Sequence, residues 1–337
     1  MIIALDIMGG DRGPHVFLPA IKRCLSDHSD LSFILCGEQD PLNTIFSKLS
    51  QSHQSRVHLR VCSQVVDMHT KPTTALRKLK DSSMRVALNT VKEGEADACV
   101  SSGNTGALMA MAYYVLKTIP GISRPALVSA LPTVTKQKVL LLDLGASINY
   151  DAESLLQYAV MGSVLMQQVE GIASPRVALL NVGEEDIKGH SLIKHADLLI
   201  SQCESVNYVG YVEGDTMFSG NVDVVVTDGF TGNVALKASE GIAKLVISEI
   251  KAITQETWFA RLISKLTLPL LKSLYQRMNP DQYNGASLIG LRGTVVKSHG
   301  NASEDACFYA IEQAISELSQ GVPEKIKTII EQELMEH

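Results

Sequence analysis

Short β-forming runs alternate along this chain with longer stretches of helical spacing. Runs rich in Val, Ile and Leu predict strands at residues 2–6, 31–37, 56–66, 96–102, 126–132, 138–144, 176–182, 206–212 and 222–228. Helical spacing follows the first strand within residues 1–25 and recurs at 73–93, 107–117 and 151–170. Asp151 is the predicted N-cap of the last of these helices. Because strands and helices alternate, we expect a mostly parallel sheet with helices on both faces.

Five of these strands end in a polar residue that is followed closely by glycine and the start of a helix. The five terminal residues are Asp6, Ser101, Asp143, Asn181 and Asp228. In a parallel sheet the carboxyl ends of the strands meet at one edge, where ligands of open α/β folds bind. Each turn there offers backbone N–H groups and a helix N-terminus, which together attract anions. We therefore expect one crowded cleft that holds an anionic ligand.

Residues 234–278 break this rhythm, because they have helical spacing without a strand. From 257 to 278 the pattern is amphipathic, and Pro269 should kink or divide the helix. We predict a helical arm within residues 242–283 that contacts a membrane surface or a partner. The predicted contact residues are Trp258, Phe259, Arg261, Leu262, Lys265, Leu266 and Lys272. A pair of helices at a dimer interface is an equally good interpretation of the same pattern.

The composition is that of an ordinary globular protein and disfavours several functional classes. The 337 residues include 30 basic and 36 acidic side chains, and the net charge of −6 argues against a general nucleic-acid binder. The six cysteines are scattered without a CxxC pair, which is typical of reduced thiols in a cytosolic protein and argues against a zinc site. No apolar run approaches the ~20 residues that span a bilayer, and the chain opens directly into a strand without a signal-peptide pattern.

Two loops after the predicted strands carry candidate binding groups. In the loop 101–107, glycines permit close backbone approach, while Asn104 and Thr105 add side-chain donors. A tight turn capped by Asn or Thr explains the same residues equally well. The loop 228–233 repeats this design, and Lys237 follows one turn into the predicted helix. A lysine there opposes the helix dipole, so it requires either solvent exposure, the commoner case, or a bound anion.

Three further cations extend this set. Lys297 and His299 are two residues apart at the end of a short strand, so their side chains should point the same way. A lone histidine is usually structural, but this pairing favours anion binding or proton transfer. Lys188 follows three acidic residues in the loop that begins at Asn181, where a solvated loop is the simpler interpretation.

Asp6 and Asp11 flank a Met-Gly-Gly turn. Two carboxylates can hold Mg²⁺, and Asp11 can equally be the N-cap of the first helix, so we favour hydrogen-bonding roles over a metal site. The chain has no GxGxxG followed by an acid about 20 residues on, which disfavours a dinucleotide site. It also has no GxxxxGK[ST] loop and no GxSxG elbow, so neither a P-loop nor a serine nucleophile has support.

Six stretches between residues 5 and 300 form a specific combination, although no single stretch is specific. They are LDIMGGD, SSGNTGALMA, SRPAL, LNVGEEDIKG, DVVVTDGFTGNVALKASEG and GASLIGLRGTVVKSHG. In this order they closely resemble the bacterial phosphate acyltransferase (PlsX) family. The chain departs from the usual family pattern at Ser102, Ser147, Tyr211 and Asp215.

The resemblance implies a three-layer α/β/α fold similar to isocitrate and isopropylmalate dehydrogenases and to phosphotransacetylases. It implies one catalytic domain over residues 1–337 that moves a fatty acyl group from acyl carrier protein to inorganic phosphate, with no organic cofactor, as a first step in phospholipid synthesis. It further implies a cytoplasmic homodimer peripherally associated with the inner face of the membrane. Its acyl phosphate product would feed a membrane-bound glycerol-3-phosphate acyltransferase.

Three alternatives stay open at this point. One is a phosphate acetyl- or butyryltransferase that uses coenzyme A esters on the same fold. The second is a metal- and NAD-dependent hydroxyacid dehydrogenase. The third is a non-catalytic adaptor that binds phosphate or lipid.

The motifs and the resemblance together give a set of predicted site residues. The predicted catalytic residues are Lys188, Lys297, His299 and Asp228. The predicted substrate-binding residues are Asp6, Gly9, Gly10, Asp11, Ser101, Gly103, Asn104, Thr105, Gly106, Asp143, Asn181, Gly183, Glu213, Gly229, Phe230, Thr231, Gly232, Asn233 and Lys237. We expect phosphate against the N–H groups of 103–106 and 229–233, with Lys188 or Lys237 as counter-charge. Lys297 and His299 would then serve the oxyanion or the leaving thiolate.

Overall fold

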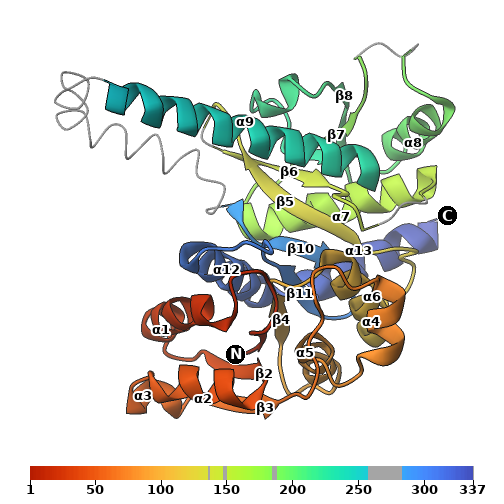
Figure 1. The fold of residues 1–337 in the computed structure, drawn as a ribbon. Coiled ribbons are helices and arrows are strands. Elements are labelled where there is room, and N and C mark those ends of the chain that lie inside the picture. Colours follow the sequence, from red (N-terminus) through yellow and green to blue (C-terminus); the bar gives the residue numbers. More distant parts are fainter. Residues whose placement is uncertain (136, 147–149, 184–187, 257–282, 337) are drawn as a thin grey trace.

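Eleven strands form one continuous sheet through the middle of the molecule (Figure 1). The computed structural model describes residues 1–135, 137–146, 150–183, 188–256 and 283–336. The strand order is β3-β2-β1-β4-β11-β10-β5-β6-β9-β7-β8. The strands are β1 (Ile2–Asp6), β2 (Ser32–Gly37), β3 (Val57–Val61), β4 (Ala98–Ser101), β5 (Ala126–Pro132), β6 (Lys138–Leu142), β7 (Arg176–Leu180), β8 (Asn207–Val212), β9 (Val224–Val226), β10 (Ala286–Ile289) and β11 (Thr294–Lys297).

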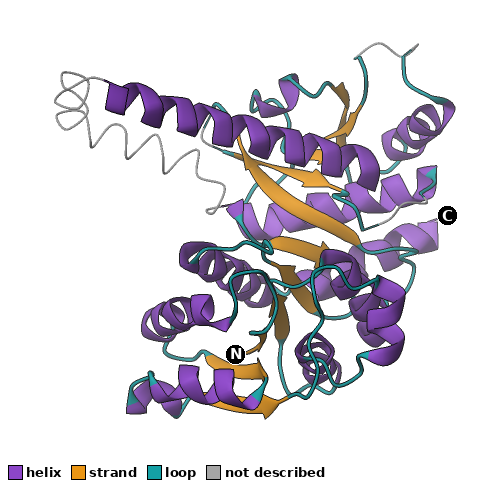
Figure 2. Cartoon of the chain, viewed as in Figure 1, coloured by secondary structure: helices purple, strands orange, loops and turns teal. Residues whose placement is uncertain are grey.

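Helices cover both faces of this sheet, so the fold has three layers (Figure 2). The α-helices are α1 (Phe17–Asp27), α2 (Gln39–Ser47), α3 (Gln51–Gln54), α4 (Pro72–Lys78), α5 (Ser83–Lys92), α6 (Thr105–Leu116), α7 (Ala152–Glu170), α8 (Ser191–Ser201), α9 (Gly229–Glu256), α12 (Glu304–Gln320) and α13 (Val322–Glu336). Two short 3-10 helices are η1 (Pro14–Val16) and η2 (Thr216–Phe218). The predicted three-layer α/β/α fold is confirmed.

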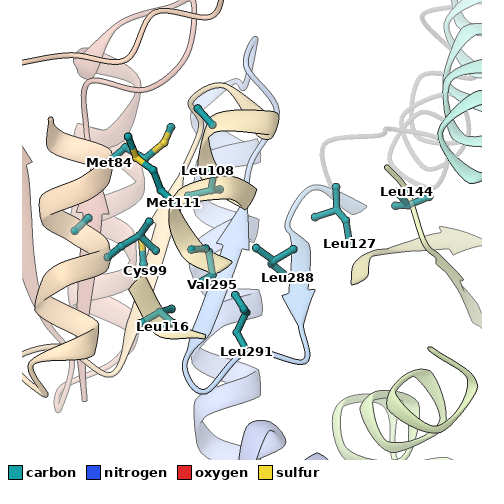
Figure 3. Packing of buried hydrophobic residues seen from close by; sticks show 14 of the residues in the cluster. Met84, Cys99, Leu108, Met111, Leu116, Leu127, Leu144, Leu288, Leu291 and Val295 are labelled. Atoms are coloured by element: carbon teal, nitrogen blue, oxygen red, sulfur yellow. The ribbon is translucent and has the colours of Figure 1, made fainter. Parts of the chain in front are cut away.

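The hydrophobic core divides along the two faces of the sheet. One face packs against α4, α5, α6 and the first turns of α9, and Figure 3 shows Met84 of α5 and Met111 of α6 meeting there above the sheet. The other face packs against α1, α2 and α12 over one half and against α7, α8 and α13 over the other. All six cysteines are buried and free, as expected for reduced thiols.

The sheet is mostly parallel, as predicted, but its direction reverses near the centre. β1 to β4 run parallel with β11, and β6, β9, β7 and β8 form a second parallel group. The pairs β11–β10, β10–β5 and β5–β6 are antiparallel, so the second group runs opposite to the first. The expectation that all five polar strand ends share one edge is therefore wrong.

Stagger between the two halves nevertheless brings their carboxyl ends to nearly the same level. Lys297, the last residue of β11, pairs with Ala286. One step further along β10, Ser287 pairs with Val128, which pairs in turn with Leu142, the last residue of β6. Strands that arrive from opposite directions thus stop beside one another, and their terminal loops face a common space.

One predicted helix and one possible helix cap differ from those observed, while another predicted cap is confirmed. The predicted helix 73–93 is divided into α4 and α5, because Ser82 leaves the helical path and caps α5 by accepting a hydrogen bond from the Arg85 N–H at 3.4 Å. The predicted cap of α7 is confirmed, since Asp151 Oδ1 accepts from the Ser154 N–H at 2.8 Å. Asp11 caps neither of the first helices, whose N-caps are Gly13 and Val16.

The predicted helical arm is only partly within the described residues. α9 extends past the edge of the sheet as far as Glu256 (Figure 1). The predicted contact residues from Trp258 to Lys272 lie outside the described residues. Within the described part of the chain, no helix combines the length and apolarity that a membrane crossing requires.

Candidate active site

A polar cavity of about 290 Å³ lies where the two groups of strands end. Its polar lining comes from the first turn of α6, the loop after β6, the first turns of α9 and the residues on either side of β10 and β11. These lining residues are Thr105, Gly106, Gly145, Asn233, Lys237, Asn284, Lys297, Ser298 and His299. Six of them belong to the predicted site: Thr105, Gly106, Asn233, Lys237, Lys297 and His299. The loops after β4, β6 and β9 therefore contribute to one cavity, whereas the loops that follow Asp6 and Asn181 do not line it. That this cavity holds an anion stays a prediction.

Lys297 is the most unusual group in this cavity. Its side chain enters from the end of β11, it is only 6% exposed, and its ammonium donates a hydrogen bond to the Ser298 carbonyl. Burial, together with the positive charge of Lys237, lowers the pKa of Lys297 to about 8, against the opposing effect of the Asp6 and Asp11 carboxylates. A buried ammonium that faces another ammonium creates a site where an anion would relieve the repulsion.

Lys237, Glu240 and His299 form a chain of charges at the mouth of the cavity. The Lys237 ammonium lies 3.0 Å from Glu240 Oε2, and His299 Nε2 lies 3.5 Å from Glu240 Oε1. Burial lowers the pKa of His299, and Glu240 opposes this shift while Lys237 and Lys297 add to it. The ring therefore favours the neutral form, which can accept a proton.

The position of Lys237 corrects one argument from the sequence. α9 begins at Gly229, so Lys237 lies eight residues, or about 12 Å, along the helix. The helix dipole acts mainly on the first turn and does not explain this lysine. Its side chain is 56% exposed and paired with Glu240, so solvent and a carboxylate stabilise its charge in the absence of an anion.

The loop after β4 is held from several sides. Asn104 caps α6 by accepting from the Ala107 N–H at 3.0 Å, and its amide donates to the carbonyls of Met68 at 2.6 Å and Thr70 at 3.1 Å. Ser101 donates to Asp6 Oδ2 at 2.7 Å and accepts from the Gly103 N–H at 3.1 Å. The interpretation of this turn as an Asn-capped helix start is confirmed. Its side chains position Thr105 and Gly106 at the cavity.

Asp6 joins three elements behind this loop. Its carboxylate is 1% exposed and accepts from Ser83 at 2.6 Å as well as from Ser101. Burial raises the pKa of Asp6, while these hydrogen bonds lower it. Asp11 lies nearby, where its backbone N–H donates to the Gly300 carbonyl at 2.7 Å. Nowhere in the described ranges do three His, Cys, Asp or Glu side chains gather as a metal site would require.

The remaining predicted residues of the first two loops support the walls instead of lining the cavity. Gly9 and Gly103 pack so closely that a Cβ on Gly9 would overlap the Gly103 nitrogen. In a separate contact, a Cβ on Gly10 would lie 2.8 Å from the Gly300 carbonyl oxygen. Close backbone approach therefore explains these glycines.

Asp228 caps the start of α9. Its Oδ1 accepts from the Phe230 and Thr231 N–H groups, each at 2.9 Å, and its Oδ2 accepts from the Thr231 hydroxyl at 2.5 Å. Gly232 fits against the Asp143 carbonyl, where a Cβ would overlap the oxygen. These contacts orient α9 so that Asn233 faces the cavity. Asp228 thus acts on the site through position, and its predicted catalytic role stays a prediction.

Comparison with known proteins now identifies the family. The family model described as "Fatty acid synthesis protein" matches residues 1–325. A phosphate acyltransferase from Pseudoalteromonas atlantica is 53% identical over 336 residues, covering 100% of this chain and 98% of that protein. Another from Shewanella sp. strain MR-4 is 50% identical with the same coverage. The chain belongs to the phosphate acyltransferase family.

Solved structures with low sequence identity share the fold of this phosphate acyltransferase family member. A phosphotransacetylase from Streptococcus pyogenes superposes with a TM-score of 0.62 at 19% identity, covering 95% of this chain and 94% of that one. A branched-chain phosphotransacylase from Enterococcus faecalis gives a TM-score of 0.56 at 15% identity, covering 94% and 99%. Family membership makes the chain an acyltransferase of fatty acid and phospholipid synthesis.

Several predicted residues of this phosphate acyltransferase family member lie away from the polar cavity. Asn181 and Gly183 follow β7, and the Asn181 amide donates weakly to the Lys188 carbonyl at 3.5 Å. Lys188 is exposed there, next to residues 184–187, which are outside the described residues. Glu213 belongs to the turn before η2, where its N–H donates to the Thr216 hydroxyl at 3.2 Å. Their roles in substrate binding and catalysis stay predictions.

Two other predicted residues have different surroundings. Asp143 is fully buried, and its Oδ1 accepts from the N–H groups of Leu127 at 2.9 Å and Ala146 at 3.0 Å. It therefore anchors the loop that carries Gly145 to the cavity. Phe230 is 77% exposed on the outer side of α9, away from the protein core.

Sequence reasoning missed Glu240, whose carboxylate lies between Lys237 and His299 in the candidate site of this phosphate acyltransferase family member. A signal was present, because Glu240 follows Lys237 by three residues and so shares its face of a helix. Asn284 was also missed: its amide donates to the Ser298 hydroxyl at 2.7 Å, and its oxygen accepts from the His299 N–H at 2.9 Å. It fixes the turn that presents His299, and only the folded chain brings it there.

Proposed function

We propose that this chain forms acyl phosphate from inorganic phosphate and a fatty acyl thioester of acyl carrier protein. The observation that carries the proposal is that two like-charged side chains, buried Lys297 and Lys237, line one polar cavity. Phosphate there would replace ammonium repulsion by two attractions in a poorly solvated space. The N–H groups at the start of α6 add donors to the same anion.

The reaction needs no covalent intermediate on the protein. A phosphate oxygen attacks the thioester carbonyl, a tetrahedral oxyanion forms, and the carbon–sulfur bond breaks to release the thiolate and leave acyl phosphate. The enzyme's tasks are to hold both partners in line and to stabilise the developing negative charge. Lys297 and Lys237 are assigned to phosphate, and His299 at the mouth of the cavity is assigned to the carbonyl oxygen or the leaving sulfur.

Lys188 keeps its predicted role as a further cation for the reaction. It lies on the loop that follows β7, at the same edge of the sheet as Asp143 and Asp228. Removal of one well-placed donor to the transition state typically lowers turnover by ~10²–10³. We expect at least this loss in Lys188→Ala if the side chain reaches the reacting groups.

The oligomer and the membrane contact are part of the same proposal. α9 exposes apolar side chains along its outer side, namely Phe230, Val234, Leu245 and Ile253. We assign this stripe to a homodimer interface, and sedimentation equilibrium would refute it by showing a monomer. The predicted arm beyond it is assigned to the inner surface of the cytoplasmic membrane, near the acyltransferase that consumes acyl phosphate. Failure to co-sediment with anionic vesicles would contradict that assignment.

The experiment that tests the function is incubation of the pure protein with palmitoyl–acyl carrier protein, with and without phosphate. Release of free carrier protein that requires phosphate, together with acyl phosphate in the products, supports the proposal. A parallel incubation with acetyl-, butyryl- and palmitoyl-coenzyme A tests the other donor class. Turnover of the coenzyme A esters alone would assign the donor to coenzyme A and refute the carrier-protein part.

A further inference from the structure

An apolar groove of about 470 Å³ opens beside the polar cavity. One wall is formed by β5 and η2 and the other by the second and later turns of α9. The side chains that form its length are Leu131, Pro132, Phe218, Ala238, Ile242 and Ala243. Ile242 is 61% exposed, so the groove is accessible from solvent in the single chain.

The groove adjoins the polar cavity. Ser129, Leu236, Tyr283 and His299 line both of them. Glu240 also borders the groove, but its carboxylate is held at the polar end by Lys237 and His299. A ligand that lies across the junction would therefore place a charged head beside the lysines and an apolar tail between β5 and α9.

We propose that this groove binds the fatty acyl chain of the substrate and that Ala238 and Ala243 set the chain length it accepts. The inference rests on the proposed function, because it seats the acyl carbon at the junction beside phosphate. An acyl chain fits the observations because the groove starts at the reacting end of the cavity and is apolar along its length. Alanine at both positions on α9 leaves the space that larger side chains would fill.

Chain-length dependence follows from burial. Each methylene moved from water into an apolar site contributes about 0.8 kcal/mol, which is about fourfold in affinity. Affinity for ligands with a phosphate-like head should therefore rise about fourfold per methylene until the groove is full. Phenylalanine at Ala238 or Ala243 should end this rise at a shorter chain.

Alkylphosphonates test the groove without any thioester chemistry. Calorimetric titration of the full-length protein with inorganic phosphate, butylphosphonate, octylphosphonate and dodecylphosphonate measures the head and the tail separately. For wild type we expect tighter binding with each longer chain. For Ala238→Phe we expect unchanged affinity for inorganic phosphate and a loss of about 60-fold for dodecylphosphonate, if three methylenes are excluded.

Two further variants, Ala243→Phe and Ala173→Phe, serve as a repeat and a control. Ala238 is exposed, so its substitution should not disturb folding, and Ala243→Phe repeats the test from a half-buried position on the same helix. Ala173→Phe is the matched control, because it adds the same ring to an exposed alanine that lines neither cavity. The control should keep the wild-type dependence on chain length. In Ala238→Phe, kcat/KM for acyl phosphate formation should fall for the palmitoyl donor more than for the octanoyl donor. In the control it should change for neither donor.

Three results would overturn the inference. Equal affinity of wild type for all three phosphonates, with normal binding of inorganic phosphate, would refute the groove while leaving the phosphate site intact. Absence of any phosphate or phosphonate binding would refute the phosphate site. It would also refute the inference that the acyl chain lies in the groove next to bound phosphate. A changed sedimentation coefficient in Ala238→Phe without a change in chain-length dependence would assign the groove to a second copy of the chain.

Discussion

Lys297→Met separates anion binding from folding at the same position. Methionine keeps an unbranched apolar side chain of similar length but removes the ammonium. Lys297 is 6% exposed and its pKa is about 8, whereas an ordinary lysine has a pKa of 10.5. The difference of about 2.5 pKa units corresponds to roughly 3 kcal/mol that the folded state spends in keeping the group charged.

The sign of the effect on stability follows from proton binding. Between about pH 8 and pH 10.5 the unfolded chain holds the Lys297 proton and the folded chain has released it, so the stability of wild type rises with pH across this window. At about pH 7 the penalty is present in full. Lys297→Met should therefore be more stable than wild type at pH 7, by up to about 3 kcal/mol, and the difference should shrink above pH 8.

The affinity of wild type for an anion should fall with rising pH over the range in which its stability rises. An anion beside the ammonium favours its charged form, so binding to wild type should weaken by up to tenfold per pH unit above about pH 8. If the anion restores the ordinary pKa, the total loss approaches about 300-fold. Lys297→Met should bind weakly at every pH, while Lys297→Arg keeps its charge and should bind without pH dependence in this window.

Titration calorimetry with sulfate measures this linkage, because sulfate does not titrate in the window. Urea unfolding of the same proteins gives the stability. A variant that loses anion affinity and gains stability at neutral pH cannot owe its defect to misfolding. Equal sulfate affinity of wild type across about pH 7.5–9.5, or unchanged affinity in Lys297→Met, would refute the assignment of Lys297 to the anion.

Three further substitutions test other buried or charged groups. Burial raises the pKa of Glu317 to about 7, so its contribution to stability is present below about pH 4.5 and lost as pH rises through 7. Glu317→Gln should stabilise the protein against urea by up to about 3 kcal/mol at pH 8 and little at pH 5, and an equal effect at both would contradict this account. Ser102→Ala removes a buried hydroxyl that has no hydrogen-bond partner among the described residues. The free energy of unfolding, measured with urea, should therefore rise by about 1 kcal/mol. A fall in this free energy would show that the hydroxyl is paired. Glu240→Gln should lower the pKa of His299 further, as measured by NMR titration of the ring protons, and a rise would refute the pairing.

Ten of the eleven strands were predicted from the sequence, but β10 was missed and the reversal of the sheet was not recognised. The runs 126–132 and 138–144 were both predicted as strands in a mostly parallel sheet. Only five residues separate β5 from β6, and a parallel crossover needs a dozen or more. That connection length was a local signal for an antiparallel pair. β10 had no such signal, because its four residues pair with segments that are distant in the sequence.

Some features of the candidate site were likewise predictable from local sequence, and others were not. Thr105 and Asn233 were predicted because each lies in a loop of recognisable composition after a predicted strand, and Lys297 because it ends a short strand beside His299. Burial of Lys297 depends on packing from α9 and β10, which no local pattern reports. The glycines were assigned to ligand contact, whereas a Cβ at Gly9 or Gly232 would overlap backbone atoms of the protein itself. Composition identified the loops, and tertiary packing determined which residues in them reach the cavity.

The order of strands has a consequence for synthesis of the chain on the ribosome. The two strands at the centre of the sheet, β11 and β10, come last in the sequence among the eleven. Until residues 286–297 emerge, β4 and β5 have no neighbour on their inner sides, and the nascent protein exposes two unpaired strand edges. Unpaired edges promote aggregation during folding, so this protein should depend on chaperones until its last strands are made. The cavity lined by Lys297, to which we assign the anion, can form only after that final closure.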